Sequence, residues 1–196
     1  MPRLTSLTTE MLVNAYASGI FPMAINESGE LGWFAPDPRA VIPLDERFHI
    51  PHGLKRTLKK GRFEVTVDQA FEEVVRACAT CHGKTWISAE IERAYLELHR
   101  DGFAHSVETR LDGKLVGGLY GVHLRAAFFG ESMFHTATDA SKVALVALVE
   151  RLRAGGFLLL DTQWSTPHLA QFGTMEIRRA EYLRQLGRAL KREAVF

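Results

Sequence analysis

The sequence has 196 residues, of which 46% are hydrophobic and 24% charged, a composition typical of a globular protein with one sizeable core. Its 24 Lys and Arg nearly balance 23 Asp and Glu, which excludes a uniformly basic surface, so any polyanion must bind a local patch. The two cysteines exclude a disulfide framework. The sequence has no run of about 20 apolar residues, and residues 1–6 lack the apolar stretch of a secretory signal. We therefore expect a cytoplasmic protein.

Residues 1–61 are expected to form a small, irregular N-terminal domain. Thr8 can cap a short helix that Gly19 ends. The next residues, up to about 45, are rich in proline and glycine, which predicts turns and short extended pieces. Five cations then fall within eight residues, at Lys55, Arg56, Lys59, Lys60 and Arg62. In a nearly neutral chain such a cluster suits a phosphate backbone, although a solvated helix face has the same pattern.

Residues 62–196 have a more regular periodicity and are expected to form the main domain. The predicted elements, in chain order, are a strand at 63–67, helices capped by Asp68 and Ser88, strands at 103–109, 114–124 and 126–131 with an Asp112-Gly113 hairpin turn, a long helix from Thr138 or Asp139 to Gly155, a strand at 157–160, a short helix at 167–172, a strand at 175–177 and a last helix through Leu190. This order is similar to the α+β fold of the GCN5-related N-acetyltransferases (GNAT fold).

Two carboxylates close consecutive strands of this predicted sheet, at Glu131 and Asp161. A strand-helix-strand crossover makes the two strands parallel, which places both residues at the same edge of the sheet. Open sheets bind ligands outside the carboxyl ends of their strands. Gln163 lies two positions after Asp161 and so shares its face. Because carboxylates near apolar surface must be partnered or used, this edge is the predicted site.

Other motifs point away from haem, metal and serine-nucleophile chemistry. Cys78-Ala-Thr-Cys81-His82 matches a c-type haem attachment motif, but no export signal accompanies it, and Cys78 falls on the apolar stripe of a predicted helix, where a thiol is a small core group. The motif also lacks the second Cys/His pair of a zinc site. The eight histidines are scattered and no G-x-S-x-G elbow is present. We therefore expect no metal site.

The segment between Glu131 and the long helix argues against coenzyme A. An acetyl-CoA enzyme of this fold needs a glycine-rich turn there, so that backbone N–H groups can bind the pyrophosphate. Residues 132–142 contain no glycine. A different acyl donor is expected.

Seven motifs spread over nearly the whole chain carry a resemblance to one family: Gly19–Pro22, Trp33–Arg39, Thr85–Ile87, Gly102–Glu108, Leu115–Gly121, Gly130–Phe134 and Asp161–Gln163. Together they resemble the bacterial leucyl/phenylalanyl-tRNA:protein transferases. The resemblance implies transfer of Leu, Phe or Met from aminoacyl-tRNA to the N-terminal Arg or Lys of a protein, which creates an N-end-rule degradation signal. It implies no cofactor, and no membrane or DNA partner.

The resemblance also implies roles for individual residues. The matched positions are Asp161 and Gln163 for catalysis, Glu131, Trp86 and Met23 for the 3′-terminal adenosine, and Leu119, Phe128 and Met133 for the transferred side chain. Met23 stands where the family often has Trp. Asp161 would be either a general base for the attacking amine or a charge that holds the cationic N-terminus of the acceptor. The basic run at 55–62 would bind the tRNA acceptor stem.

Two other interpretations remain open. One is a different acyltransferase of the same fold, such as an N-acetyltransferase or a peptidoglycan-type aminoacyl-tRNA transferase. The other is a non-catalytic RNA-binding module. Incubation with Leu-tRNA and a peptide that begins with Arg separates all three.

Overall fold

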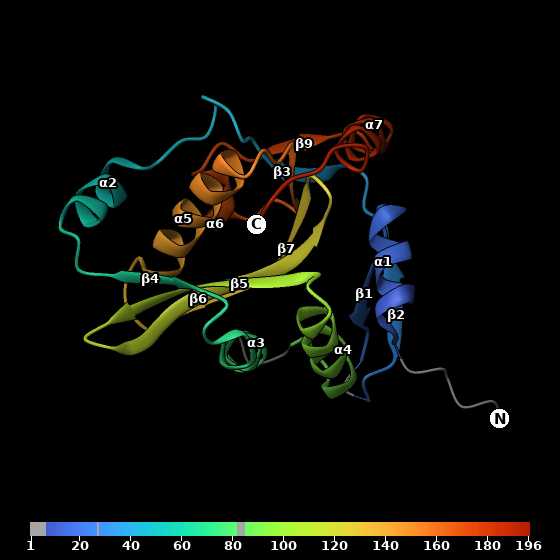
Figure 1. Ribbon diagram of the computed structural model, residues 1–196, viewed down its shortest axis with the longest axis horizontal. Helices are drawn as coiled ribbons and strands as arrows, with labels where there is room; N and C mark the ends of the chain where they lie inside the picture. Colours follow the sequence, from blue (N-terminus) through green and yellow to red (C-terminus); the bar gives the residue numbers. More distant parts are fainter. Residues whose placement is uncertain (1–6, 27, 82–84) are drawn as a thin grey trace.

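The computed structural model describes residues 7–26, 28–81 and 85–196 and is built around a seven-stranded sheet (Figure 1). The strands in spatial order are β4 (Glu64–Val67), β5 (Ala104–Leu111), β6 (Lys114–Leu124), β7 (Ala127–His135), β8 (Leu159–Gln163), β3 (Arg39–Ile42) and β9 (Met175–Ile177). A separate hairpin is formed by β1 (Phe21–Ala24) and β2 (Leu31–Phe34). The helices are α1 (Thr9–Ala17), α2 (His52–Lys59), α3 (Phe71–Thr80), α4 (Ala89–Arg100), α5 (Ala140–Ala154), α6 (Pro167–Ala170) and α7 (Arg179–Ala189).

Helices cover both faces of the sheet. On one face, α3 packs against β6 and β7, α1 against β6 and α4 against β5; on the opposite face, α5 packs against β5, β6 and β7, and α2 packs against α5 (Figure 1). Successive residues of a strand point to opposite faces. Phe129 therefore belongs to the core under α3 and α4, and Phe128 to the core under α5.

The parallel arrangement of β7 and β8, predicted from the strand-helix-strand order, is confirmed. The two strands pair from Ala127 opposite Leu159 to Phe129 opposite Asp161. Beyond this register they continue without pairing to each other, so an opening forms between their carboxyl ends. The carboxyl ends of β7 and β8, which were predicted to lie at one edge of the sheet, therefore stand on the two sides of a gap within it.

A β-bulge interrupts β7 at this opening. Tyr120 of β6 lies opposite Ser132, and the next residue, Gly121, lies opposite Gly130. Glu131 is thus an extra residue in β7. Bulges of this kind bend a strand and redirect a side chain, and they are frequent beside active sites.

The N-terminal part of the chain contributes a strand to the main sheet. β3 lies between β8 and β9 and is antiparallel to both. All four of its residues, Arg39–Ile42, are buried. The division of the chain at residue 61 stays a prediction, but the sheet requires residues on both sides of it.

Several local predictions are confirmed. The side chains of Thr8 and Ser88 cap α1 and α4 by accepting the backbone N–H groups of Met11 and Ile91. Asp112 and Gly113 form the predicted hairpin turn, with φ of +50° and +74°, as an Asp-Gly turn requires.

Two local predictions need correction. Asp68 does not cap α3, since its carboxylate accepts the backbone N–H of Ser106 on β5, and Ala70 stands at the helix N-cap. The strand predicted at 126–131 continues to His135. The predicted start of the long helix is confirmed: Asp139 is the N-cap residue of α5, although its carboxylate binds Thr57 and Lys142 and not the helix N-terminus.

Cys78 is buried in α3, which agrees with a structural thiol, whereas His82 lies outside the described residues. No helix in the part of the chain that the structure describes is long and apolar enough to cross a membrane.

Candidate active site

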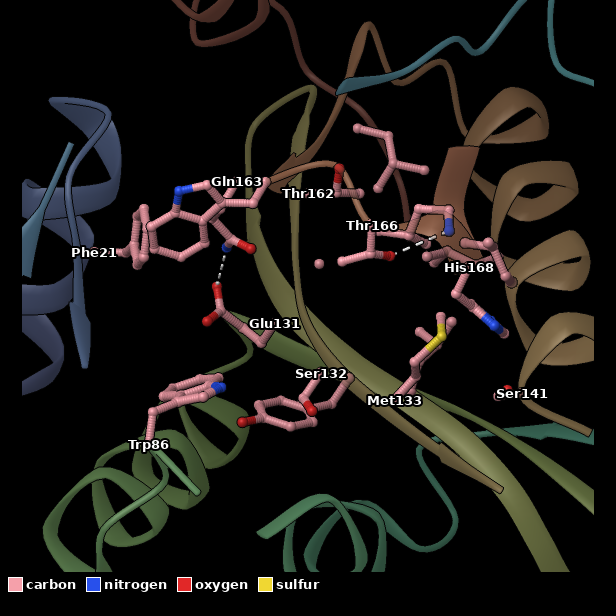
Figure 2. A pocket seen from close by; sticks show the side chains of 18 of the residues that line it. Phe21, Trp86, Glu131, Ser132, Met133, Ser141, Thr162, Gln163, Thr166 and His168 are labelled. Carbon is pink, nitrogen blue, oxygen red and sulfur yellow. Dashed lines mark hydrogen bonds between the residues drawn. The ribbon is translucent and has the colours of Figure 1, made fainter. Parts of the chain in front are cut away.

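The opening between β7 and β8 leads into a cavity of about 520 Å³. Figure 2 shows Glu131, Gln163, Phe21 and Trp86 around one end of it, and Met133, Ser141 and His168 around the other. The wall between the two ends is largely apolar, and it includes Leu119, Leu145, Leu148, Leu160 and Leu169. A cavity of this kind suits an apolar group that carries a polar reacting centre at one end.

Glu131 is the central acidic group of the cavity. Its carboxylate accepts hydrogen bonds from the hydroxyls of Tyr16 (2.7 Å) and Tyr95 (2.9 Å) and from the amide Nε2 of Gln163 (3.1 Å). The two tyrosine hydroxyls also lie within hydrogen-bonding distance of each other, but each has a single proton, so they cannot donate all three bonds at once. Burial raises the pKa of Glu131 to about 7, and the hydrogen bonds from Tyr16 and Tyr95 oppose this rise. Glu131 can therefore change its protonation state near neutral pH.

Asp161 lies behind the cavity and does not line it. Its carboxylate accepts from the Nε and Nη2 atoms of Arg39, at 2.9 and 2.7 Å, and from the hydroxyl of Tyr182 at 2.7 Å. Both Asp161 and Arg39 are 0% exposed. Oδ1 of Asp161 also accepts the backbone N–H of Gln163 at 2.8 Å. Asp161 is therefore hydrogen-bonded to one residue of the cavity lining, Gln163.

Gln163 sits in a tight turn that carries its side chain back across the opening. Its φ is +58°, and the N–H of Trp164 donates to the carbonyl of Thr162 at 2.7 Å. A residue other than glycine is uncommon at positive φ, and such strained turns occur mainly at functional sites. The turn holds the Gln163 amide against Glu131.

Trp164, directly after this turn, forms part of the cavity lining and is 42% exposed. Its indole packs edge-on against Phe21, with ring centroids 5.2 Å apart. Trp86 and Met23 line the cavity as well. The three side chains give this end a rim of flat or flexible apolar groups, which suits a heterocyclic base.

The structure brings most of the predicted site residues together. Glu131, Gln163, Trp86, Met23, Leu119 and Met133 all line the cavity. Phe128 does not: it is completely buried, and its ring stacks on Phe196 at 5.3 Å and meets Phe157 edge-on. Phe128 therefore supports the wall from behind.

The five predicted tRNA-binding cations are all exposed, on α2 and the residues just after it. The helix is attached to the body by buried Leu54 and by a hydrogen bond from Thr57 to Asp139 (3.0 Å), just before α5. Figure 1 places α2 beyond α5, at the far end of the molecule from α1. Whether this patch binds tRNA stays a prediction.

Among the described residues, no group of three His, Cys, Asp or Glu side chains is placed to hold a metal ion.

Comparisons with known proteins identify the family. Residues 41–187 match the model for leucyl/phenylalanyl-tRNA protein transferase, and residues 5–37 match the model for the N-terminal domain of these proteins. A leucyl/phenylalanyl-tRNA–protein transferase from Akkermansia muciniphila is 59% identical over 189 residues, which are 95% of this chain and 98% of that protein. The transferase from Herpetosiphon aurantiacus is 57% identical over 190 residues, 97% of this chain and 98% of its own. The chain belongs to the leucyl/phenylalanyl-tRNA–protein transferase family.

The transferase is therefore an aminoacyltransferase that acts on an aminoacyl-tRNA and a protein. The predicted α+β, GNAT-like fold is also confirmed. The solved structure of FemX superimposes with a TM-score of 0.55 at 12% identity and covers 87% of this chain and 66% of that chain.

Sequence reasoning missed several residues of this transferase's site. Tyr16 and Tyr95 both lie on helix faces that pack into the core, so their pattern predicts packing and gives no sign of the hydroxyl contacts. Arg39 is the last residue of the motif Trp33–Arg39 and Trp164 directly follows the motif Asp161–Gln163, but only the fold shows that Arg39 pairs with Asp161. His168 was counted among the scattered histidines, yet it lines the cavity.

Proposed function

We propose that this transferase moves Leu, Phe or Met from aminoacyl-tRNA to the N-terminal Arg or Lys of acceptor proteins in the cytoplasm, and that the product is an N-end-rule degradation signal. One observation carries the proposal: an apolar cavity joins directly onto the hydrogen-bonded pair Glu131–Gln163. An apolar side chain fits the first part, and the reacting ester and amine fit the second. Such a pocket discriminates weakly among apolar side chains of similar size, which supports the transfer of all three amino acids, Leu, Phe and Met.

The donor's 3′-terminal adenosine is proposed to lie against the rim at the Glu131 end. Trp86 and Met23 supply apolar surface for the base, and Trp164 adds a second exposed indole beside them. Glu131 can accept a hydrogen bond from a ribose hydroxyl at this position. Leu119 and Met133 then flank the transferred side chain, with Phe128 behind the wall.

The chemistry is aminolysis of an activated ester. The acceptor's α-amine attacks the ester carbonyl carbon, a C–N bond forms, the C–O bond to the ribose breaks, and the amine's proton passes to the ribose oxygen. An α-amine has a pKa of about 7.7–8.0, so roughly a tenth of it is unprotonated at pH 7, and positioning supplies a large part of the rate. In our proposal Gln163 orients the reactants.

Asp161 is proposed to act through Gln163. Its carboxylate does not line the cavity and already accepts from four donor groups: Nε and Nη2 of Arg39, the Tyr182 hydroxyl and the Gln163 backbone N–H. This supports a positioning and electrostatic role over direct removal of the amine's proton. The cavity carboxylate is Glu131, whose pKa of about 7 suits proton exchange with an amine.

The experiment that tests the proposal combines the purified protein, Leu-tRNA and a labelled peptide that begins with Arg. Mass spectrometry of the peptide should show one added leucine, and a matched peptide with an acetylated N-terminus should stay unmodified. Dependence on acetyl-CoA would favour another acyltransferase of this fold. Binding of Leu-tRNA without turnover would favour an RNA-binding module, and either result would contradict the proposal.

A further inference from the structure

The sequence holds a second cluster of cations, in α7 and the residues just after it. Residues 178–192, here called the α7 segment, contain six Arg or Lys and a single acid, Glu181. The run at 55–62 contains five cations and no acid. Of the chain's 24 cations and 23 acids, 13 cations and 22 acids lie outside these two segments. A polyanion is therefore attracted to these two segments and repelled by the net negative charge of the remaining chain.

Three cations of the α7 segment lie along one exposed face. Arg184, Arg188 and Lys191 follow one another at spacings of four and three residues, which aligns them on one side of a helix, and all three are exposed. Arg184 pairs with Glu181. Arg188 and Lys191 form no salt bridge with any residue that the structure describes. No existing ion pair has to break when these two bind a phosphate.

α7 lies behind the Glu131 end of the cavity. The guanidinium of Arg39 lies 4.7 Å from the ring of Phe21 and 4.6 Å from the ring of Tyr182 on α7. Phe21 lines the cavity and stands at the Glu131 end of it (Figure 2). Two side chains, Phe21 and Arg39, thus connect this end of the cavity to α7.

The run at 55–62 adjoins the other end of the cavity. Thr57 of α2 bonds to Asp139, two residues before Ser141, which lines that end. Figure 1 shows α2 and α7 well apart, α2 beyond α5 and α7 beside β9. In the proposed function the 3′-terminal adenosine lies at the Glu131 end. The RNA strand that leads into this adenosine is therefore nearer to α7 than to α2.

We infer that the exposed face of α7 binds the phosphate backbone of the donor RNA close to its 3′ end, through Arg184, Arg188 and Lys191. The inference rests on the proposed function, which places the adenosine. Ala180 and Gly187 fall on the same face, so neither a bulky side chain nor an acid lies between the cations. Phosphate contacts carry no sequence information, which suits an enzyme that takes donors with different aminoacyl groups.

The test compares two donors, Leu-tRNA and leucyl-adenosine, which lacks every phosphate of the RNA. The variant is Arg188→Ala with Lys191→Ala. The control is Arg100→Ala with Lys114→Ala, since both are exposed cations outside the two basic segments, and Arg100 stands in the last turn of α4 as Arg188 does in α7. The measurements are kcat and KM for each donor, KM for the Arg peptide, and the salt dependence of the Kd for uncharged tRNA.

The α7 variant should raise KM for Leu-tRNA about tenfold at low salt. The slope of log Kd against log salt concentration should become shallower by about two, one for each lost phosphate contact. Both kcat and KM for leucyl-adenosine should keep their wild-type values, and the control variant should leave every value unchanged.

Three outcomes would overturn the inference while wild type still transfers leucine. An unchanged salt slope in the α7 variant would mean that water alone solvates this face. Equal loss with both donors would mean that the two residues support the fold. A raised KM for the peptide alone would mean that the face binds the acceptor. If wild type transfers leucine from neither donor, the proposed function fails, and the inference fails with it.

Discussion

Replacement of Asp161 by Asn should destabilise the fold as well as slow transfer. Asp161 is the counter-ion of Arg39, and both side chains are fully buried. Removal of one partner leaves an uncompensated buried charge, at a cost of about 3–5 kcal/mol, out of the roughly 5–15 kcal/mol that stabilises a typical domain. Asn keeps an acceptor oxygen for the backbone N–H of Gln163, but its NH2 group replaces Oδ2, which accepts from Arg39 and Tyr182, so the change removes the charge and one acceptor.

A double variant separates the two effects. Arg39→Met combined with Asp161→Asn removes both charges, and the flexible Met side chain fills much of the volume of Arg. Since replacement of a whole buried ion pair is often neutral or stabilising, the double variant should regain most of the lost unfolding free energy. Transfer should stay about 10²- to 10⁴-fold below wild type, because the negative charge behind Gln163 is still missing.

The assay pairs urea unfolding with initial rates of transfer, each at a temperature where the variant is folded. Asp45→Asn is the control, since the Asp45–Arg47 pair is exposed and its loss should cost less than about 1 kcal/mol. A single variant as stable as this control would refute the ion-pair argument. A double variant with wild-type transfer would mean that Asp161 serves only as the counter-ion of Arg39.

The remaining predictions concern pH, specificity and tRNA. The pKa of Glu131 is about 7 in the fold against 4.5 in the unfolded chain, so the folded protein binds the extra proton between these values and loses stability as pH rises through 7. Glu131→Gln removes this pH dependence. In urea unfolding, the free energy of unfolding of the variant minus that of wild type should therefore rise by about 2 kcal/mol from pH 5 to pH 8; the same difference at both pH values would contradict the prediction. Met133→Ala enlarges the cavity and should shift the Phe/Leu ratio of kcat/KM toward Phe by about tenfold, whereas equal loss with both would mean that Met133 is only core. Lys55→Ala with Lys59→Ala should raise KM for Leu-tRNA, most at low salt, and leave a minimal aminoacyl-adenosine donor unaffected; loss with both donors, or with neither, would argue against tRNA contact.

The sequence was sufficient to predict the order of elements because hydrophobic period and capping residues are local signals. The helix caps at Thr8 and Ser88 and the turn at Asp112-Gly113 needed only their neighbours. Asp68 shows where local reasoning fails. Its cap position was plausible, but a backbone N–H on β5 binds the carboxylate instead, and no local pattern reports that competition.

The candidate site was predicted in composition but not in geometry. Their places at the ends of predicted strands selected Glu131, Asp161 and Gln163, the crossover rule put the two acids near one edge, and the family resemblance implied their roles. The opposite environments of the two acids were not predictable, because they depend on residues distant in the chain. Arg39 pairs with Asp161 from 122 positions away, and Tyr16 reaches Glu131 from 115 positions away.

Three backbone features create the end of the cavity around Glu131. Pairing of β7 with β8 ends at Phe129 opposite Asp161, so the strands separate where a continued ladder would close the space. The bulge then makes Glu131 an extra residue, and the turn at Gln163 directs its amide back across the gap, to 3.1 Å from that carboxylate. Glu131 and Gln163 thus bridge two strands whose backbones no longer bond. In the proposed function the transferred side chain lies against the apolar walls and the ester lies at this bridge, so binding of the one and alignment of the other depend on the same separation of β7 from β8.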